Sequence, residues 1–156
     1  MKYFENDRKL YLLVNNKEHQ VDMKVTYGCK ENEGDSVIIS VVYEGQVYSG
    51  YGHEYLGLEA FADLQKQLPQ GVIMKCCLSC KHGNQCPVGN SPNELFCTRD
   101  VDIKQIEDLW FYTEDETERQ KRRRSYASVC AEWQKQSEEY YTYNDFYYLM
   151  QIVRRK

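Results

Sequence analysis

Residues 20–29, QVDMKVTYGC, alternate between two kinds of side chain. One set of alternate positions is apolar and consists of Val21, Met23, Val25, Tyr27 and Cys29. The positions between them are largely polar. A period of two is the pattern of a β-strand that lays one face on a hydrophobic core. This stretch therefore predicts that the chain builds an early, half-buried sheet.

The neighbouring stretches predict three more strands of the same sheet. Residues 9–14 end at Asn15-Asn16-Lys17, and asparagine tolerates the positive backbone angles of a tight turn. Residues 36–43, SVIISVVY, are rich in β-branched side chains, as expected for a strand at a sheet centre. Glu44-Gly45 separates them from a fourth strand at 46–52. Connections this short predict an antiparallel meander, because parallel strands need longer crossovers.

The pattern changes to a helical one over residues 55–68. Leu58, Phe61 and Leu68 recur at helical spacing, and Pro69 ends the run. A fifth strand is expected at 71–76, and residues 93–101 predict a sixth.

The last third of the chain, residues 113–156, is predicted to be helical. Thr113 and Glu116 match a capping box, and the run Lys121–Arg124 fits an exposed helix face. A long helical stripe comprises Tyr126, Val129, Cys130, Trp133, Ser137 and Tyr140 or Tyr141. A second helix is expected from Asn144, with Phe146, Leu149, Met150 and Val153 turned inward. The predicted fold is one α+β domain over residues 1–156, with an antiparallel sheet of five or six strands, one short helix and a C-terminal helical pair.

Five of the seven cysteines lie within the loop at residues 76–97. The N-terminus lacks the apolar core of a signal peptide, and we find no 18-residue apolar window, so we expect a cytoplasmic protein without a membrane segment. In a reducing compartment, clustered cysteines bind metal more often than they form disulfides. A C-x2-C turn brings two thiolates to one small cation, and sulfur-rich tetrahedral sites are typical of structural zinc. We therefore predict a zinc knuckle, with Cys76 and His82 as alternate ligands to the main set of Cys77, Cys80, Cys86 and Cys97.

Three other interpretations of the cysteine loop stay open. The thiols can be free residues of a Gly/Pro-rich loop, or they can hold an iron–sulfur cluster, although the spacing matches neither ferredoxin pattern. Cys77 and Cys80 can also form a redox pair, which is more usual at a helix start within a βαβ unit.

The loop resembles one found in an uncharacterised group of small bacterial proteins. The resemblance is C-x-x-C, then P-x-G-N, then C-x-R, and covers about a fifth of the chain. The matching residues are Cys77, Cys80, Pro87, Gly89, Asn90, Cys97 and Arg99. Thr98 departs from an aromatic position, and Cys86 replaces a small polar residue, so the shared pattern contains three cysteines. The resemblance implies a bacterial protein and carries no activity.

The function predicted from sequence is non-catalytic protein binding or regulation. The chain has 14 tyrosines, and tyrosine offers a large contact area at little entropic cost; we expect a partner surface at Tyr140, Tyr141 and Tyr143. A net charge of −4 provides no general attraction to nucleic acid. A toxin-neutralising, immunity-like or other regulatory partner would suit a small acidic protein. The alternative is a thiol redox or metal-dependent enzyme that uses the same cysteines.

Overall fold

The computed structural model describes residues 9–30, 34–53, 57–87, 94–110, 115–144 and 146.

The predicted antiparallel meander is confirmed. Its strands are β1 (Lys9–Val14), β2 (Lys17–Lys30), β3 (Gly34–Tyr43) and β4 (Gln46–His53), and β5 (Val72–Lys75) pairs with β1 to give the order β4-β3-β2-β1-β5. Asn15 and Asn16 have φ angles of 50° and 63°, which matches the turn predicted between the first two strands. Glu44 and Gly45 also have positive φ, at 49° and 76°. The large sheet is therefore set up by short, local turns.

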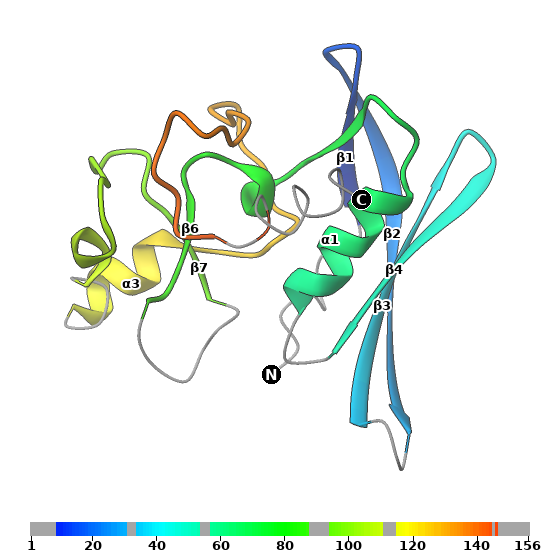
Figure 1. The fold of residues 1–156 in the computed structure, drawn as a ribbon, viewed down its shortest axis with the longest axis horizontal. Helices are drawn as coiled ribbons and strands as arrows, with labels where there is room; N and C mark the ends of the chain where they lie inside the picture. The colour runs from blue at the N-terminus through cyan, green and yellow to red at the C-terminus, as the bar shows by residue number, and fades with distance from the viewer. Residues whose placement is uncertain are drawn as a thin grey trace.

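Helix α1 (Gly57–Gln67) covers one face of the large sheet. In Figure 1 this face is turned toward the rest of the molecule. The helix approaches β4 closely at Gly50, where an added Cβ would lie 2.0 Å from the carbonyl oxygen of Ala60. The core between them is fully buried and includes Leu10, Leu12, Val37, Ile39, Phe61, Leu64 and Met74. The helix predicted at 55–68 is thus present, with bounds that differ by one or two residues.

A second, smaller sheet has the order β6-β7-β8 and comprises β6 (Gly83–Gln85), β7 (Leu95–Cys97) and β8 (Arg123–Arg124). The 3-10 helix η2 (Cys77–Ser79) connects β5 to this region, and a second 3-10 helix, η3 (Ile106–Leu109), follows β7. The strand expected at 93–101 therefore exists as β7, but it belongs to the small sheet. Leu95 and Tyr126 share the main hydrophobic cluster with the large sheet, so the two sheets pack on a continuous core.

The prediction of one long helix from 113 to about 141 is wrong. Helix α3 spans only Glu116–Arg122, and Asp115 caps it by accepting the N–H groups of Thr117 and Glu118 at 3.0 and 3.2 Å. From residue 125 to 144 the chain is irregular, because its backbone groups bond elsewhere; the carbonyl of Tyr126, for example, accepts the N–H of Leu78. Tertiary bonding has overridden helix propensity here.

Other parts of the C-terminal prediction lie outside the described residues. They are Thr113 of the expected capping box and Leu149, Met150 and Val153 of the expected second helix. Phe146 is described and is fully buried in the main cluster, as expected for an inward position. The helical pair is therefore not confirmed.

None of the helices within the described ranges has the length and apolar character needed to cross a membrane.

Candidate functional site

The C-x2-C turn directly follows the large sheet. Cys76 has no exposed surface and packs in the main core, whereas Cys77 and Cys80 face the small sheet. The N–H of Cys80 donates to the carbonyl of Cys77 at 3.2 Å and closes the turn. Strand β6 passes directly against it, since an added Cβ on Gly83 would lie 2.1 Å from the Cys77 carbonyl oxygen. The glycine thus allows the small sheet to approach the turn.

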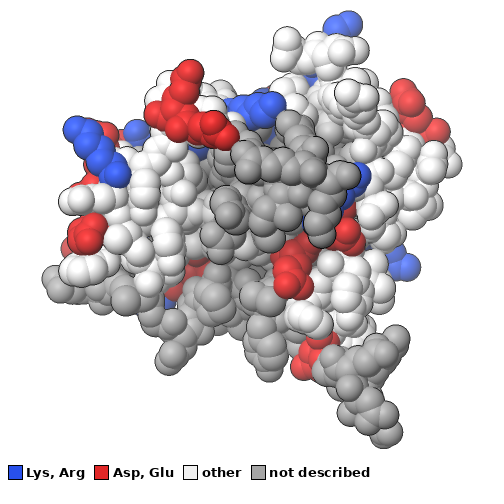
Figure 2. Space-filling model, viewed as in Figure 1, with Lys and Arg blue, Asp and Glu red and all other residues white. Residues whose placement is uncertain are grey.

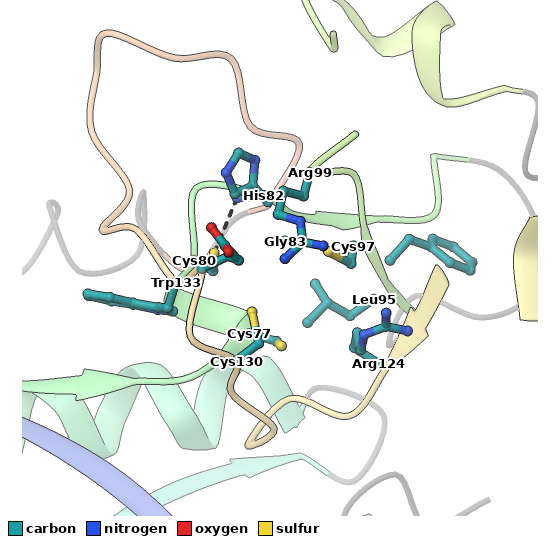
Figure 3. Close-up of a pocket in the computed structure, with 12 residues that line it drawn as sticks. Cys77, Cys80, His82, Gly83, Leu95, Cys97, Arg99, Arg124, Cys130 and Trp133 are labelled. Atoms are coloured by element: carbon teal, nitrogen blue, oxygen red, sulfur yellow. Dashed lines mark hydrogen bonds between the residues drawn. The ribbon is translucent and has the colours of Figure 1, made fainter. Parts of the chain in front are cut away.

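Cysteines from three segments line one cavity, which we call the thiol cavity (Figure 3). Cys77 and Cys80 come from the turn, Cys97 from the end of β7, and Cys130 from the irregular C-terminal segment. The cavity volume is about 20 Å³, which is room for one water-sized body. The remaining wall is formed by His82, Gly83, Leu95, Phe96, Arg99, Arg124, Glu132 and Trp133.

The segment 125–136 wraps around the turn and carries Cys130 to the cavity. Cys77 donates its N–H to the carbonyl of Ser128 at 2.6 Å, and Lys81 donates to that of Gln134 at 2.8 Å. Side-chain bonds add to these: Trp133 Nε1 donates to the Cys76 carbonyl at 2.9 Å, and Gln136 Nε2 to the carbonyls of Leu78 and Cys80 at 3.0 and 3.2 Å. The two segments are therefore fixed to each other although the bonded residues lie 51 to 58 positions apart in the chain.

Two of the sulfur atoms have hydrogen-bond donors next to them. The N–H of His82 donates to the sulfur of Cys80 at 3.5 Å, and Figure 3 marks this bond. The hydroxyl of Ser128 lies 3.4 Å from the sulfur of Cys77, at donor distance. Donors placed in this way favour the thiolate over the thiol.

Burial acts in the opposite direction. Desolvation raises the pKa of Cys77 to about 12, and the nearby thiols of Cys80 and Cys97 add to the rise. Desolvation also raises the pKa of Cys80, with Cys97 and Cys130 adding to it. Burial therefore favours the protonated thiol at Cys77 and Cys80 unless a further positive charge is supplied. A protonated thiol is a poor nucleophile.

Two guanidinium groups, from Arg99 and Arg124, border the thiol cavity. Arg124 Nη1 donates to the carbonyls of Lys121 and Arg123 at 3.0 and 2.8 Å. Within the described ranges, no ion pair joins Arg99 or Arg124 to a carboxylate. The cavity wall thus carries positive charge that is not used in a salt bridge there.

The structure brings together three of the four predicted metal ligands. Cys86 does not line the thiol cavity; it packs beside the small cluster of Phe96 and Leu109. Of the alternates, Cys76 belongs to the main core, where burial raises its pKa to about 11, and His82 lines the cavity. Among the residues described, no group of three or more His, Cys, Asp or Glu side chains is placed so that it could hold a metal ion. The sulfurs surround the cavity without forming a ready coordination shell.

Cys130 is the cavity cysteine that the sequence did not indicate as a ligand. It follows Cys97 by 32 intervening residues, outside the C-x2-C loop, and it fits a helical stripe. The only sequence signal was that it is a further thiol outside the cysteine loop.

A larger groove adjoins the thiol cavity, with a volume of about 690 Å³. His82 and Arg99 line both, so one wall is shared. Tyr140 and Tyr141 also line the groove, and 48% and 39% of their surfaces are exposed. The ammonium group of Lys81 lies 3.6 Å from the centre of the Tyr140 ring, which holds that ring in a cation–π contact.

Tyr143, the third tyrosine of the predicted partner surface, lies elsewhere. It is partly buried against Phe96 and Leu109, and its N–H donates to Asn84 Oδ1 at 2.7 Å. Two of the three tyrosines predicted to bind a partner therefore line the groove, and the third packs against the small sheet.

The basic run Lys121–Arg124 does not form one exposed face, contrary to the prediction. Arg122 is only 8% exposed, and its guanidinium binds Asp100 Oδ2 at 3.0 Å and Glu118 Oε2 at 2.8 Å. Figure 2 shows Lys and Arg intermixed with Asp and Glu on the face in view. The run thus contributes internal ion pairs and part of the thiol cavity wall.

Comparisons of the chain with protein-family models, with curated proteins and with solved structures find no match. The loop resemblance therefore transfers no function, and the site itself carries the proposals that follow.

Proposed function

We propose that this chain is a non-catalytic protein-binding domain and that the groove beside Tyr140 and Tyr141 is its contact surface. The observation that carries the proposal is the position of these two half-exposed rings on the border of a groove of about 690 Å³. Exposed tyrosines at the edge of a concave surface are typical of binding hot spots.

The charges of the groove support a partner segment that combines carboxylates with an apolar or aromatic side chain. Lys104 is already paired with Asp102 at 3.1 Å, and Asp100 is paired with Arg122. Lys81, Arg99 and Glu139 have no ion pair in the described part of the chain, so one positive charge is in excess among the unpaired groups of the groove. An acidic partner would supply the missing counter-charge.

The alternative of a thiol redox enzyme receives less support. Desolvation raises the pKa of Cys77 to about 12, and a pair of thiols must form a thiolate to exchange disulfides. We place the binding function in a bacterial cytoplasm, where an immunity-like or other regulatory role suits a small acidic chain.

The test is capture of a partner by the immobilised full chain. Wild type is compared with the double variant Tyr140→Ser, Tyr141→Ser, and with Tyr51→Ser as a control. Tyr51 is 48% exposed, like Tyr140, but it lies on β4 of the large sheet. Circular dichroism establishes that each variant is folded.

We expect the wild type and Tyr51→Ser to capture the same partner and the double variant to lose it. Equal capture by all three proteins, or no specific partner for the wild type, would contradict the proposal.

A further inference from the structure

We infer that the thiol cavity is a zinc site with four thiolate ligands, which are Cys77, Cys80, Cys97 and Cys130. This inference concerns a different site from the partner groove and does not depend on it. It replaces Cys86 of the sequence prediction with Cys130.

The first argument is convergence of the donors. Three segments of the chain meet at this cavity, and each places sulfur in its wall. The volume of about 20 Å³ admits one small body, so one ion would be shared by all four thiolates. Four sulfur donors around one centre are typical of structural zinc, which has no redox chemistry and accepts tetrahedral geometry.

The second argument is the hydrogen bonding of the sulfurs. The N–H of His82 points at Cys80, and the Ser128 hydroxyl lies at donor distance from Cys77. Hydrogen bonds from an outer layer of residues orient metal ligands and tune their charge. Neutral thiols in an apolar pocket would gain little from these donors, whereas thiolates bound to a cation would gain much.

The third argument is charge. Four thiolates and one Zn²⁺ leave a net charge of −2 on the site. Arg99 and Arg124 stand in the cavity wall and form no salt bridge with any described carboxylate. Their two positive charges would offset the charge of the zinc–thiolate centre, while Glu132 adds one negative charge to the wall. Both arginines border the cavity and are also exposed to solvent.

Binding requires a change of side-chain position and of protonation. The described thiols surround the cavity but are not placed to hold an ion, so their side chains must rotate inward. A cysteine side chain has three staggered rotamers, so its sulfur can take up other positions. Zn²⁺ displaces one proton from each of the four thiols and forms four zinc–sulfur bonds, with no change in oxidation state.

The main test is metal content of the reduced full chain, purified without added metal and then incubated with zinc and dialysed. Wild type is compared with Cys130→Ser and with Cys86→Ser, a matched control for a loop cysteine outside the cavity. We expect one zinc per chain in wild type and in Cys86→Ser. Cys130→Ser should bind zinc at least about tenfold more weakly, since one ligand is lost.

A second measurement keeps the test valid if Cys130→Ser does not fold. Titration of wild type with Co²⁺ should give the intense thiolate-to-metal charge-transfer band of a tetrahedral sulfur site, and zinc should abolish it. Zinc binding in weak buffer at pH 7 should release four protons per chain.

The inference is overturned if the wild type binds neither zinc nor cobalt, or if it contains iron. It is also overturned if Cys86→Ser loses zinc while Cys130→Ser retains it. None of these readouts involves the partner, so failure here and failure of partner binding are distinguishable.

Discussion

The large sheet with α1 and the region from residue 76 onward are stabilised in different ways. The first has a core of apolar side chains from neighbouring strands, joined by short turns. All the buried polar and charged residues that the structure describes lie in the second region: Ser79, Asn84, Gln85, Glu94, Thr98, Arg122, Gln136 and Asn144. An apolar core forms from local patterns, whereas a polar one needs specific partners from distant parts of the chain. The two regions should therefore respond differently to the same kind of change.

The largest expected effect is a cavity in the large sheet. Ile39 lies in β3 with no exposed surface, and it faces the main core. Ile39→Ala should lower the free energy of unfolding by about 2–5 kcal/mol, because it removes buried methyl groups and leaves a void. Urea denaturation followed by circular dichroism measures the loss. A loss below about 1 kcal/mol would show that this core is not closely packed.

A smaller loss is expected from a polar position in the second region. Asn144 Nδ2 donates to the carbonyls of Leu78 and Gly83 at 2.8 and 3.0 Å, and the residue is 7% exposed. Asn144→Ala should cost about 1–3 kcal/mol, because it removes two buried hydrogen bonds, although the Leu78 carbonyl keeps the one from Gln136 Nε2. The exposed Gln134→Ala serves as the control, and equal stability of the two variants in urea denaturation would refute the role given to Asn144.

The sequence predicted the first region far better than the second, for a physical reason. Alternation in residues 20–29 and the Asn15-Asn16 turn act over a few residues, so they indicate strands and hairpins directly. The C-x2-C of Cys77 and Cys80 is equally local. No local signal places Cys130 beside it, because bonds such as that from Cys77 N–H to the Ser128 carbonyl join distant segments.

The same cause explains the failed helix. Residues 126–141 carry a helical stripe, but several of their backbone carbonyls accept hydrogen bonds from the C-x2-C turn instead of from a helix. The spacing of apolar residues gives no sign of these long-range bonds. Proximity in sequence predicts a shared surface for Tyr140, Tyr141 and Tyr143. Because the chain is irregular here, Tyr140 and Tyr141 line the groove whereas Tyr143 packs against Phe96 and Leu109.

The smallest effect concerns acid stability of the second region. A hydrogen bond from Arg122 lowers the pKa of Asp100 from 3.8 to about 2. Because the folded pKa lies below the unfolded one, the ionised carboxylate stabilises the fold fully above about pH 4, and this stabilisation is lost as the pH falls toward 2. The side chain of Asp100 is 60% exposed, so solvent screening keeps the effect small.

Thermal melting between pH 5 and pH 2 tests this. Asp100→Asn should flatten the pH dependence relative to wild type, while Asp102→Asn, next to it on the surface, should not. Identical pH profiles for wild type and Asp100→Asn would contradict the assignment.

Hydrogen–deuterium exchange of the zinc-loaded chain, with and without a chelator, tests most directly whether the thiol cavity holds the second region together. We predict that removal of zinc accelerates exchange at residues 77–83, 95–97 and 126–136, whereas β1 to β4 keep their protection. Unchanged exchange in those three segments, or an equal increase throughout the large sheet, would contradict the account.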